Sequence, residues 1–289
     1  MQSVAIIGSG QMGTGIAQTV AQHGIKVMLA DVDLARAEAG KASVEKALGK
    51  LVGRGKMEAD AAEALLARIT PVADYAPMQD ANMIIEAATE REEIKQSIFE
   101  AAGKVLSDDA IMASNTSSIP ITRMANYSPD PARFIGLHFF NPVPVMGLIE
   151  VIPGLATAQN TTDRTSAFAQ ELGKEVVLSQ DEPGFVVNRI LLPMINEAIF
   201  LLGQSTAGIE DVDKGCRLGL NHPMGPLQLA DFVGLDTCLD IINVLYRTTR
   251  DTKYRPAPLL VKYVEAGWLG RKTGRGFYDY SGDAPVPTR

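Results

Sequence analysis

The fold of this chain is decided by ten residues near the N-terminus: Val4-Ala5-Ile6-Ile7-Gly8-Ser9-Gly10-Gln11-Met12-Gly13. The first four form an apolar run typical of a buried strand, and the last six fit the G-x-G-x-x-G pattern. A helical pattern follows over residues 13–23. At such a strand-to-helix turn Gly8 allows the tight bend, Gly10 lets backbone approach a pyrophosphate, and Gly13 lets the helix pack on the sheet. The stretch predicts a Rossmann-type dinucleotide-binding fold, with Gln11 and Met12 at the phosphate-facing helix N-terminus.

The residue that ends the next apolar run indicates which dinucleotide is bound. Residues 26–30 form that run, and Asp31 follows it, about twenty positions after the glycines as the pattern requires. A carboxylate at this place accepts hydrogen bonds from the adenosine ribose hydroxyls and repels a 2′-phosphate. No Lys or Arg occurs in residues 32–35. We therefore expect NAD(H) rather than NADP(H).

The rest of the chain divides at Pro183-Gly184. Before it, apolar runs at 83–86, 111–114, 134–138, 148–152 and 175–178 alternate with helical patterns at 33–68 (interrupted at 53–55), 91–105 and 162–172. This alternation is typical of a parallel sheet with crossover helices. After it, the pattern is helical to about residue 267. We expect an α/β Rossmann domain with a helical insertion at 1–183, an all-α domain at 184–289, and a mobile tail from 281 onward.

Composition excludes several classes of function. Lys and Arg total 27 against 34 Asp and Glu, a net charge of −7, whereas nucleic-acid binding needs clustered positive charge. The two cysteines, Cys216 and Cys238, have no partner at metal-ligand spacing, so we expect neither a metal site nor a disulfide framework. No apolar stretch reaches membrane-spanning length and no basic start marks a signal peptide, so we expect a cytoplasmic protein.

Two polar residues interrupt neighbouring apolar runs. His138, one of three histidines, closes the run at 134–138, and Glu150 lies within the run at 148–152. A buried carboxylate is costly unless it is paired. The turn between the runs contains Pro142 and Pro144 and would bring the strands side by side, within reach of a His–Glu hydrogen bond. Such a bond suits an imidazole for proton transfer; a buried structural histidine is the alternative.

Polar residues also follow the run at 111–114 and open the helical half. Ser117 lies in Ser114-Asn115-Thr116-Ser117-Ser118, at the carboxyl edge where ligands bind in open α/β sheets. Asn188 opens a very apolar helix at the domain junction. Each residue has an alternative structural role, as a turn or helix cap for Ser117 and as a helix-start hydrogen bond for Asn188.

Five motifs spread over the chain share a further property: together they resemble one family. They are Ser114-Asn115-Thr116-Ser117-Ser118, His138-Phe139-Phe140-Asn141-Pro142-Val143, Pro183-Gly184-Phe185-Val186-Val187-Asn188-Arg189, His222-Pro223-Met224-Gly225-Pro226 and Gly270-Arg271-Lys272-Thr273-Gly274-Arg275-Gly276-Phe277-Tyr278. The chain resembles the 3-hydroxyacyl-CoA dehydrogenases over essentially its whole length, and within them the short bacterial enzymes of 3-hydroxybutyryl-CoA. The resemblance implies NAD-dependent interconversion of (S)-3-hydroxyacyl-CoA and 3-ketoacyl-CoA.

The resemblance also implies roles for individual residues. His138 would be the general acid/base, oriented by Glu150, with Ser117 and Asn188 contacting the substrate. Residues similar to the family's cofactor contacts follow predicted strands: Glu90, Lys95, Ser117 and Asn141.

Coenzyme A requires contacts of its own for its phosphates. A basic cluster lies at residues 41–56, and the family's helical extension at this place implies that Lys50 and Lys56 contact CoA. A solvated helix face is the alternative for this cluster. The resemblance further implies a homodimer formed through the C-terminal domain.

Two other functions remain open from the sequence. Dehydrogenases of the 3-hydroxyisobutyrate and 6-phosphogluconate type share a Rossmann and a helical domain but use a catalytic lysine in the interdomain helix, where this chain has Asn188-Arg189. A non-catalytic NAD-binding relative is the second alternative. The presence of His138, Glu150, Ser117 and Asn188 argues against it.

Overall fold

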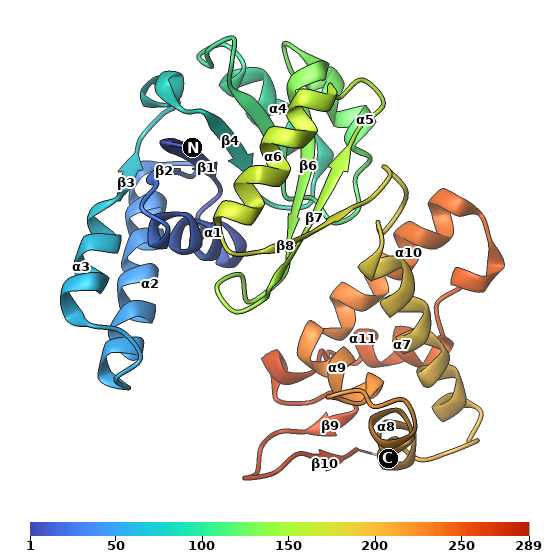
Figure 1. Cartoon of the computed structure of the whole chain (residues 1–289). Helices are drawn as coiled ribbons and strands as arrows, with labels where there is room; N and C mark the ends of the chain where they lie inside the picture. The colour runs from blue at the N-terminus through green and yellow to red at the C-terminus, as the bar shows by residue number, and fades with distance from the viewer. Residues whose placement is uncertain (289) are drawn as a thin grey trace. The chain divides into compact units, whose positions relative to one another are not determined.

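The computed structural model describes residues 1–288, and the chain forms two compact units, Met1–Phe185 and Val186–Arg289. The first unit contains an eight-stranded sheet with the order β3-β2-β1-β4-β5-β6-β7-β8 (Figure 1). Its strands are β1 (Ser3–Ile7), β2 (Lys26–Ala30), β3 (Ile69–Val72), β4 (Met83–Glu86), β5 (Ile111–Ser114), β6 (Phe134–Phe139), β7 (Leu148–Pro153) and β8 (Glu175–Leu178).

Strands β1 to β6 are parallel, so their carboxyl ends meet at one edge of the sheet. The central order 3-2-1-4-5 is that of dinucleotide-binding sheets, in which ligands lie at this edge. Strand β7 returns antiparallel to β6 and places Glu150 opposite His138. The predicted α/β fold class is confirmed.

Helices cover both faces of the sheet, which is why the central strands carry buried apolar side chains on both faces. Val4 and Ile6 point into the core on one face, whereas Ala5 and Ile7 point into the core on the other. On the first face lie α1 (Gln11–Gln22), α2 (Leu34–Gly53), α3 (Ala59–Ala67) and α6 (Gln159–Glu171), and on the second α4 (Glu92–Ala102) and α5 (Ile121–Met124).

The second unit is a helical bundle. Its helices are α7 (Val187–Gly203), α8 (Ile209–Gly219), α9 (Pro226–Val233), α10 (Leu235–Thr249) and α11 (Pro258–Glu265). Two buried acids brace it: Asp213 accepts from the backbone N–H groups of Leu227 and Gln228 at the start of α9, and Asp231 accepts from those of Phe277 and Tyr278. Within residues 1–288 no helix is long and apolar enough to cross a membrane.

One strand was not predicted, and the expectation of a mobile tail is wrong. Residues 69–72 form the edge strand β3, although Pro71 weakens the strand pattern; an edge strand tolerates proline because one side of it needs no ladder bond. The tail is not a free segment, since β10 (Val286–Pro287) pairs antiparallel with β9 (Tyr278–Asp279). Thr288 donates its backbone N–H to the carbonyl of Phe277, which extends this hairpin.

Candidate active site

The glycine-rich turn has the geometry that a pyrophosphate requires. Gly8 has a φ of +107°, and a Cβ there would lie 2.6 Å from the carbonyl oxygen of Ala87. A Cβ on Gly13 would overlap the carbonyl of Gly8, so the helix packs directly on the turn. At Gly10 the space is open, and no side chain caps α1. The first amides of α1 are therefore available to an anion.

Asp31 is held in a fixed orientation beside this turn. Its Oδ2 accepts from the backbone N–H of Ser9 at 2.6 Å and from the Ser9 hydroxyl at 2.8 Å, and its Oδ1 accepts from Val32 N–H at 2.8 Å. Partial burial alone would raise the pKa of Asp31. The hydrogen bonds from Ser9 and Val32 and the charge of Arg36 instead hold that pKa below its ordinary value. The carboxylate stays ionised and suited to ribose hydroxyls.

A cavity of about 470 Å³ opens between the turn and the end of β4. The residues that line it include Gly8, Gly10, Asp31, Tyr75, Ala88 and Ile98. Apolar walls with one anchoring carboxylate are what an adenosine group needs.

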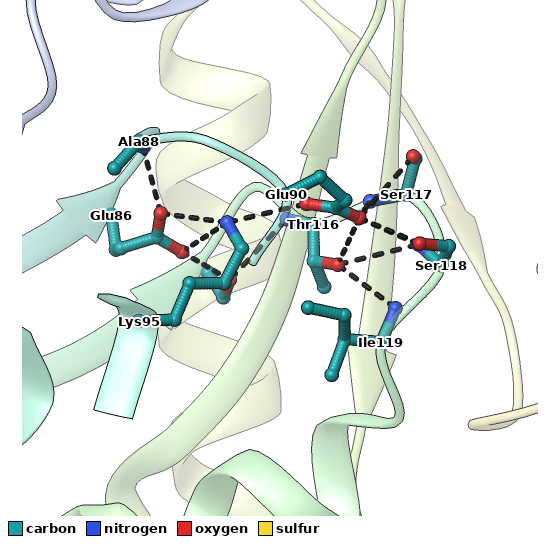
Figure 2. A network of polar contacts seen from close by, with 9 residues as sticks. Glu86, Ala88, Glu90, Lys95, Thr116, Ser117, Ser118 and Ile119 are labelled. Atoms are coloured by element: carbon teal, nitrogen blue, oxygen red, sulfur yellow. Dashed lines mark hydrogen bonds and ion pairs between the residues drawn. The ribbon is translucent and has the colours of Figure 1, made fainter. Parts of the chain in front are cut away.

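A buried ion pair stands at the end of β4 (Figure 2). Lys95 Nζ on α4 lies 2.7 Å and 2.9 Å from the two carboxylate oxygens of Glu86, and both side chains are buried. Glu86 also accepts from Ala88 N–H at 2.7 Å and from the Ser114 hydroxyl at 2.6 Å. This pair therefore joins the wall of the adenosine-type cavity to the end of β5.

Glu90 extends this network to the turn after β5. Its Oε2 lies 3.3 Å from Lys95 Nζ, and its Oε1 accepts from the Thr116 hydroxyl at 2.6 Å and from Ser117 and Ser118 N–H (Figure 2). Burial alone would raise the pKa of Glu90, but the Lys95 ammonium and these hydrogen bonds hold it below its ordinary value. Glu90 thus fixes the backbone that carries Ser117.

The predicted contact between His138 and Glu150 is present. Glu150 Oε2 lies 2.7 Å from His138 Nδ1; the Glu150 side chain is fully buried and that of His138 is 7% exposed. The end of β6 is tied to β5 because Asn115 Oδ1 accepts from Phe139 N–H at 2.8 Å. With the bond to Glu150 at Nδ1, the other ring nitrogen is left for a reacting group. Phe140 and Phe185 pack around the ring.

A groove of about 490 Å³ runs between α1, α2 and the loop that follows β6. Asn141 and Val143 line it from the loop, and Lys56 lines it from the α2–α3 connection. Lys50 is exposed on the last turn of α2. Lys56 therefore faces a ligand-sized groove, and Lys50 faces solvent.

Asn188 belongs to the second unit, where it lies near the start of α7 and is 9% exposed. The other candidate residues all lie in the first unit. Among residues 1–288 no group of three or more His, Cys, Asp or Glu side chains is placed to hold a metal ion.

The sequence analysis missed Glu86 and Lys174. Glu86 ends an apolar strand, the same signal that singled out Glu150, so it could have been found. Lys174 precedes β8 at a position that looks solvent-facing in sequence, but its side chain is buried.

Comparison with known proteins covers both units. The family model described as 3-hydroxyacyl-CoA dehydrogenase, NAD binding domain, matches residues 3–182, and the model of the C-terminal domain of the same family matches residues 184–280. The chain is 51% identical over 289 residues to 3-hydroxybutyryl-CoA dehydrogenase of Bradyrhizobium diazoefficiens, covering 100% of this chain and 99% of the relative. It is 48% identical to a probable 3-hydroxybutyryl-CoA dehydrogenase of Bacillus subtilis, covering 97% and 98%.

A solved structure also supports membership of this family. The chain superposes on the crystal structure of (S)-3-hydroxybutyryl-CoA dehydrogenase from Ralstonia eutropha with a TM-score of 0.94 at 46% identity, covering 98% of this chain and 100% of that one.

Proposed function

Since the chain belongs to the 3-hydroxyacyl-CoA dehydrogenase family, and is therefore an NAD-dependent oxidoreductase, we propose that its substrates are (S)-3-hydroxybutyryl-CoA and acetoacetyl-CoA. The single observation that carries the chemistry is the hydrogen bond between His138 Nδ1 and buried Glu150. The names of the similar proteins support the short acyl chain.

His138 moves the proton in this proposal. In oxidation the neutral imidazole accepts the proton of the C3 hydroxyl, and in reduction the imidazolium returns it to the developing alkoxide. Glu150 orients the ring through Nδ1 and stabilises the imidazolium with its charge. NAD(H), when bound, accepts or supplies the hydride at C3.

The residues at the carboxyl edge would hold the cofactor. The turn of Gly8, Gly10 and Gly13, with the amides of Gln11 and Met12, fits the pyrophosphate, and Asp31 fits the ribose. Glu90 and Asn141 would contact the nicotinamide half. Because Lys95 is buried against Glu86, we propose that it acts on the cofactor through Glu90.

Two polar residues are the proposed substrate contacts. Ser117, on a turn fixed by Glu90, and Asn188, at the start of α7, would position the substrate oxygens, which is the orientation part of catalysis. Lys56 would contact CoA in the groove. Lys50 would act at longer range because its side chain does not line the groove.

We further propose a cytoplasmic homodimer, with residues 1–183 as the NAD-binding domain and 184–289 as the substrate and dimerisation domain. Cys216 and Cys238 are free thiols, as in a reducing compartment. Leu218 and Leu220 at the end of α8 are 78% and 62% exposed, and a second copy would cover them. Sedimentation of wild type against a Leu218→Lys/Leu220→Lys variant tests the dimer.

The deciding experiment is to follow nicotinamide absorbance with acetoacetyl-CoA and NADH. Consumption of NADH that depends on the thioester is expected. Reduction of NAD⁺ with 3-hydroxyisobutyrate or 6-phosphogluconate instead would favour the first alternative function. Cofactor binding without turnover of any of these substrates would favour a non-catalytic relative.

A further inference from the structure

A buried lysine clamps the loop between the two strands that carry His138 and Glu150. Lys174 lies between α6 and β8, and its side chain is 9% exposed. Its ammonium donates to the carbonyl oxygen of Val143 at 2.9 Å and to that of Met146 at 2.8 Å. Burying an ammonium against neutral carbonyls is costly, and burial lowers the pKa of Lys174. Because burying this ammonium is unfavourable, we expect its role to lie in the loop that it contacts, residues 143–146.

The backbone at Lys174 is itself fixed by hydrogen bonds. Its backbone N–H donates to the carbonyl of Ala169 in α6, and the next residue, Glu175, donates its N–H to the carbonyl of Gly147. The backbone that carries the lysine is therefore bonded to α6 on one side and to Gly147, before β7, on the other. The loop closes on itself as well, because Val145 and Met146 N–H both donate to the carbonyl of Pro142.

The clamped loop forms one wall of the groove that faces Lys56. Asn141 and the four residues after it line the groove, and α1 lines the other side. The loop meets α1 closely at Gly15, where an added Cβ would lie 3.0 Å from the Cβ of Val143. The side chain of Val143 thus packs against Gly15, and its carbonyl oxygen accepts from the ammonium of Lys174.

We infer that Lys174 is a positioning residue for the acyl-CoA substrate: its ammonium sets the path of residues 143–146 and with it the width of the CoA groove. This inference rests on the proposed function, because it takes the groove to be the CoA site. In this inference residues 143–146 contact the CoA part of the substrate and not the reacting carbon, so their position contributes equally to the ground state and the transition state. Loss of the clamp should therefore raise KM for the thioester and leave kcat largely unchanged.

The test uses Lys174→Met, which keeps the length of the side chain and removes its donors. Lys104→Met is the matched control, because Lys104 is an exposed lysine of the same unit. We expect KM for acetoacetyl-CoA to rise about tenfold in Lys174→Met with kcat largely unchanged, as for a contact made equally in the ground state and the transition state. KM for NADH should stay at the wild-type value, and Lys104→Met should match wild type in both constants. An equal rise in both KM values, or no rise, would overturn the inference.

A second measurement does not depend on catalysis. Val145 is 76% exposed and Met146 39% exposed, so a protease specific for apolar residues can reach the loop once it moves. Lys174→Met should be cut between residues 143 and 147 faster than wild type and Lys104→Met, with the site located by mass spectrometry. Equal cutting rates in the folded proteins would show that Lys174 does not hold the loop. A wild type inactive on acetoacetyl-CoA would refute the proposed function, while this readout would still report on the clamp.

Should Lys174→Met fail to fold, Gly15→Ala perturbs the same loop from α1. Its new methyl group presses on Val143, and we expect KM for acetoacetyl-CoA to rise while KM for NADH does not. An unchanged KM for the thioester would contradict a groove whose width is set by this loop.

Discussion

Lys95 Nζ lies 2.7 Å from one carboxylate oxygen of Glu86 and 3.3 Å from a carboxylate oxygen of Glu90, so a single buried cation holds two acids at the carboxyl edge of the sheet. Glu86 fixes Ala88, which lines the adenosine-type cavity, and Glu90 fixes the turn that carries Ser117. The cofactor side and the substrate side of the first unit are thereby joined through one ammonium.

Removing that ammonium should destabilise the protein. Lys95→Met leaves Glu86 buried without its cation, and breaking one partner of such a pair costs ~3–5 kcal/mol. Urea unfolding of Lys95→Met against the exposed-site control Lys104→Met measures the loss. Glu86→Gln/Lys95→Met, which removes both charges, should recover part of it. Equal midpoints for Lys95→Met and the control would contradict the role given to this pair.

His138→Ala should lower kcat about 10²–10⁴-fold in both directions, the usual size of a general acid/base contribution. This corresponds to ~3–5 kcal/mol of barrier. NADH affinity, measured by fluorescence, should stay near wild type because the glycine turn is untouched. Wild-type kcat in a folded His138→Ala protein would refute the assignment.

Glu150→Gln keeps the shape of the orienting side chain and removes its charge. The amide stabilises an imidazolium less than a carboxylate does, so reduction of acetoacetyl-CoA at neutral pH should slow. Its kcat should lie between those of wild type and His138→Ala. A kcat equal to wild type would mean that Glu150 serves the packing of β7 alone.

Asp31→Ser tests cofactor choice. The wild-type carboxylate is held ionised by Ser9 and Val32, so it repels a 2′-phosphate. The substitution should narrow the preference for NADH over NADPH in kcat/KM by about tenfold or more. The contrary result would be a wild-type enzyme that prefers NADPH.

Much of this site could be predicted from the sequence, for reasons that are local. His138 and Glu150 lie on strands joined by a short loop, so their pairing follows from strand adjacency, and the glycine turn follows from its own spacing. The network around Lys95 could not be predicted in this way, because β4, α4 and β5 meet only in the folded sheet. Lys174 gave no signal, since burial of its side chain depends on where the loop at 143–146 comes to lie. The tail was mispredicted because its hairpin with β9 is a tertiary contact.

The two lysines of the helical insertion should differ in their effect on CoA. Lys56→Ala should raise KM for acetoacetyl-CoA about 1.4- to fivefold, since an exposed charge pair contributes ~0.2–1 kcal/mol. Lys50→Ala should raise it less, because that side chain lies outside the lining of the groove. Added salt should shrink both effects. A larger effect at Lys50 would place the CoA phosphates away from the groove.

The last prediction concerns Asp231 and the stability of the second unit. Burial raises the pKa of Asp231 to about 6 from an ordinary value of 3.8, despite hydrogen bonds from Phe277, Tyr278 and Tyr280. The folded state therefore binds this proton more tightly than the unfolded state, so stability from this group is gained as pH falls through 6 and is complete below 3.8. Between pH 7 and pH 5 the gain is about 1 kcal/mol. Asp231→Asn cannot titrate, so although it should be less stable overall, its free energy of unfolding should lack this rise. Urea unfolding of both proteins at pH 7, 6 and 5 gives the comparison, and parallel pH profiles would show that Asp231 is ionised throughout.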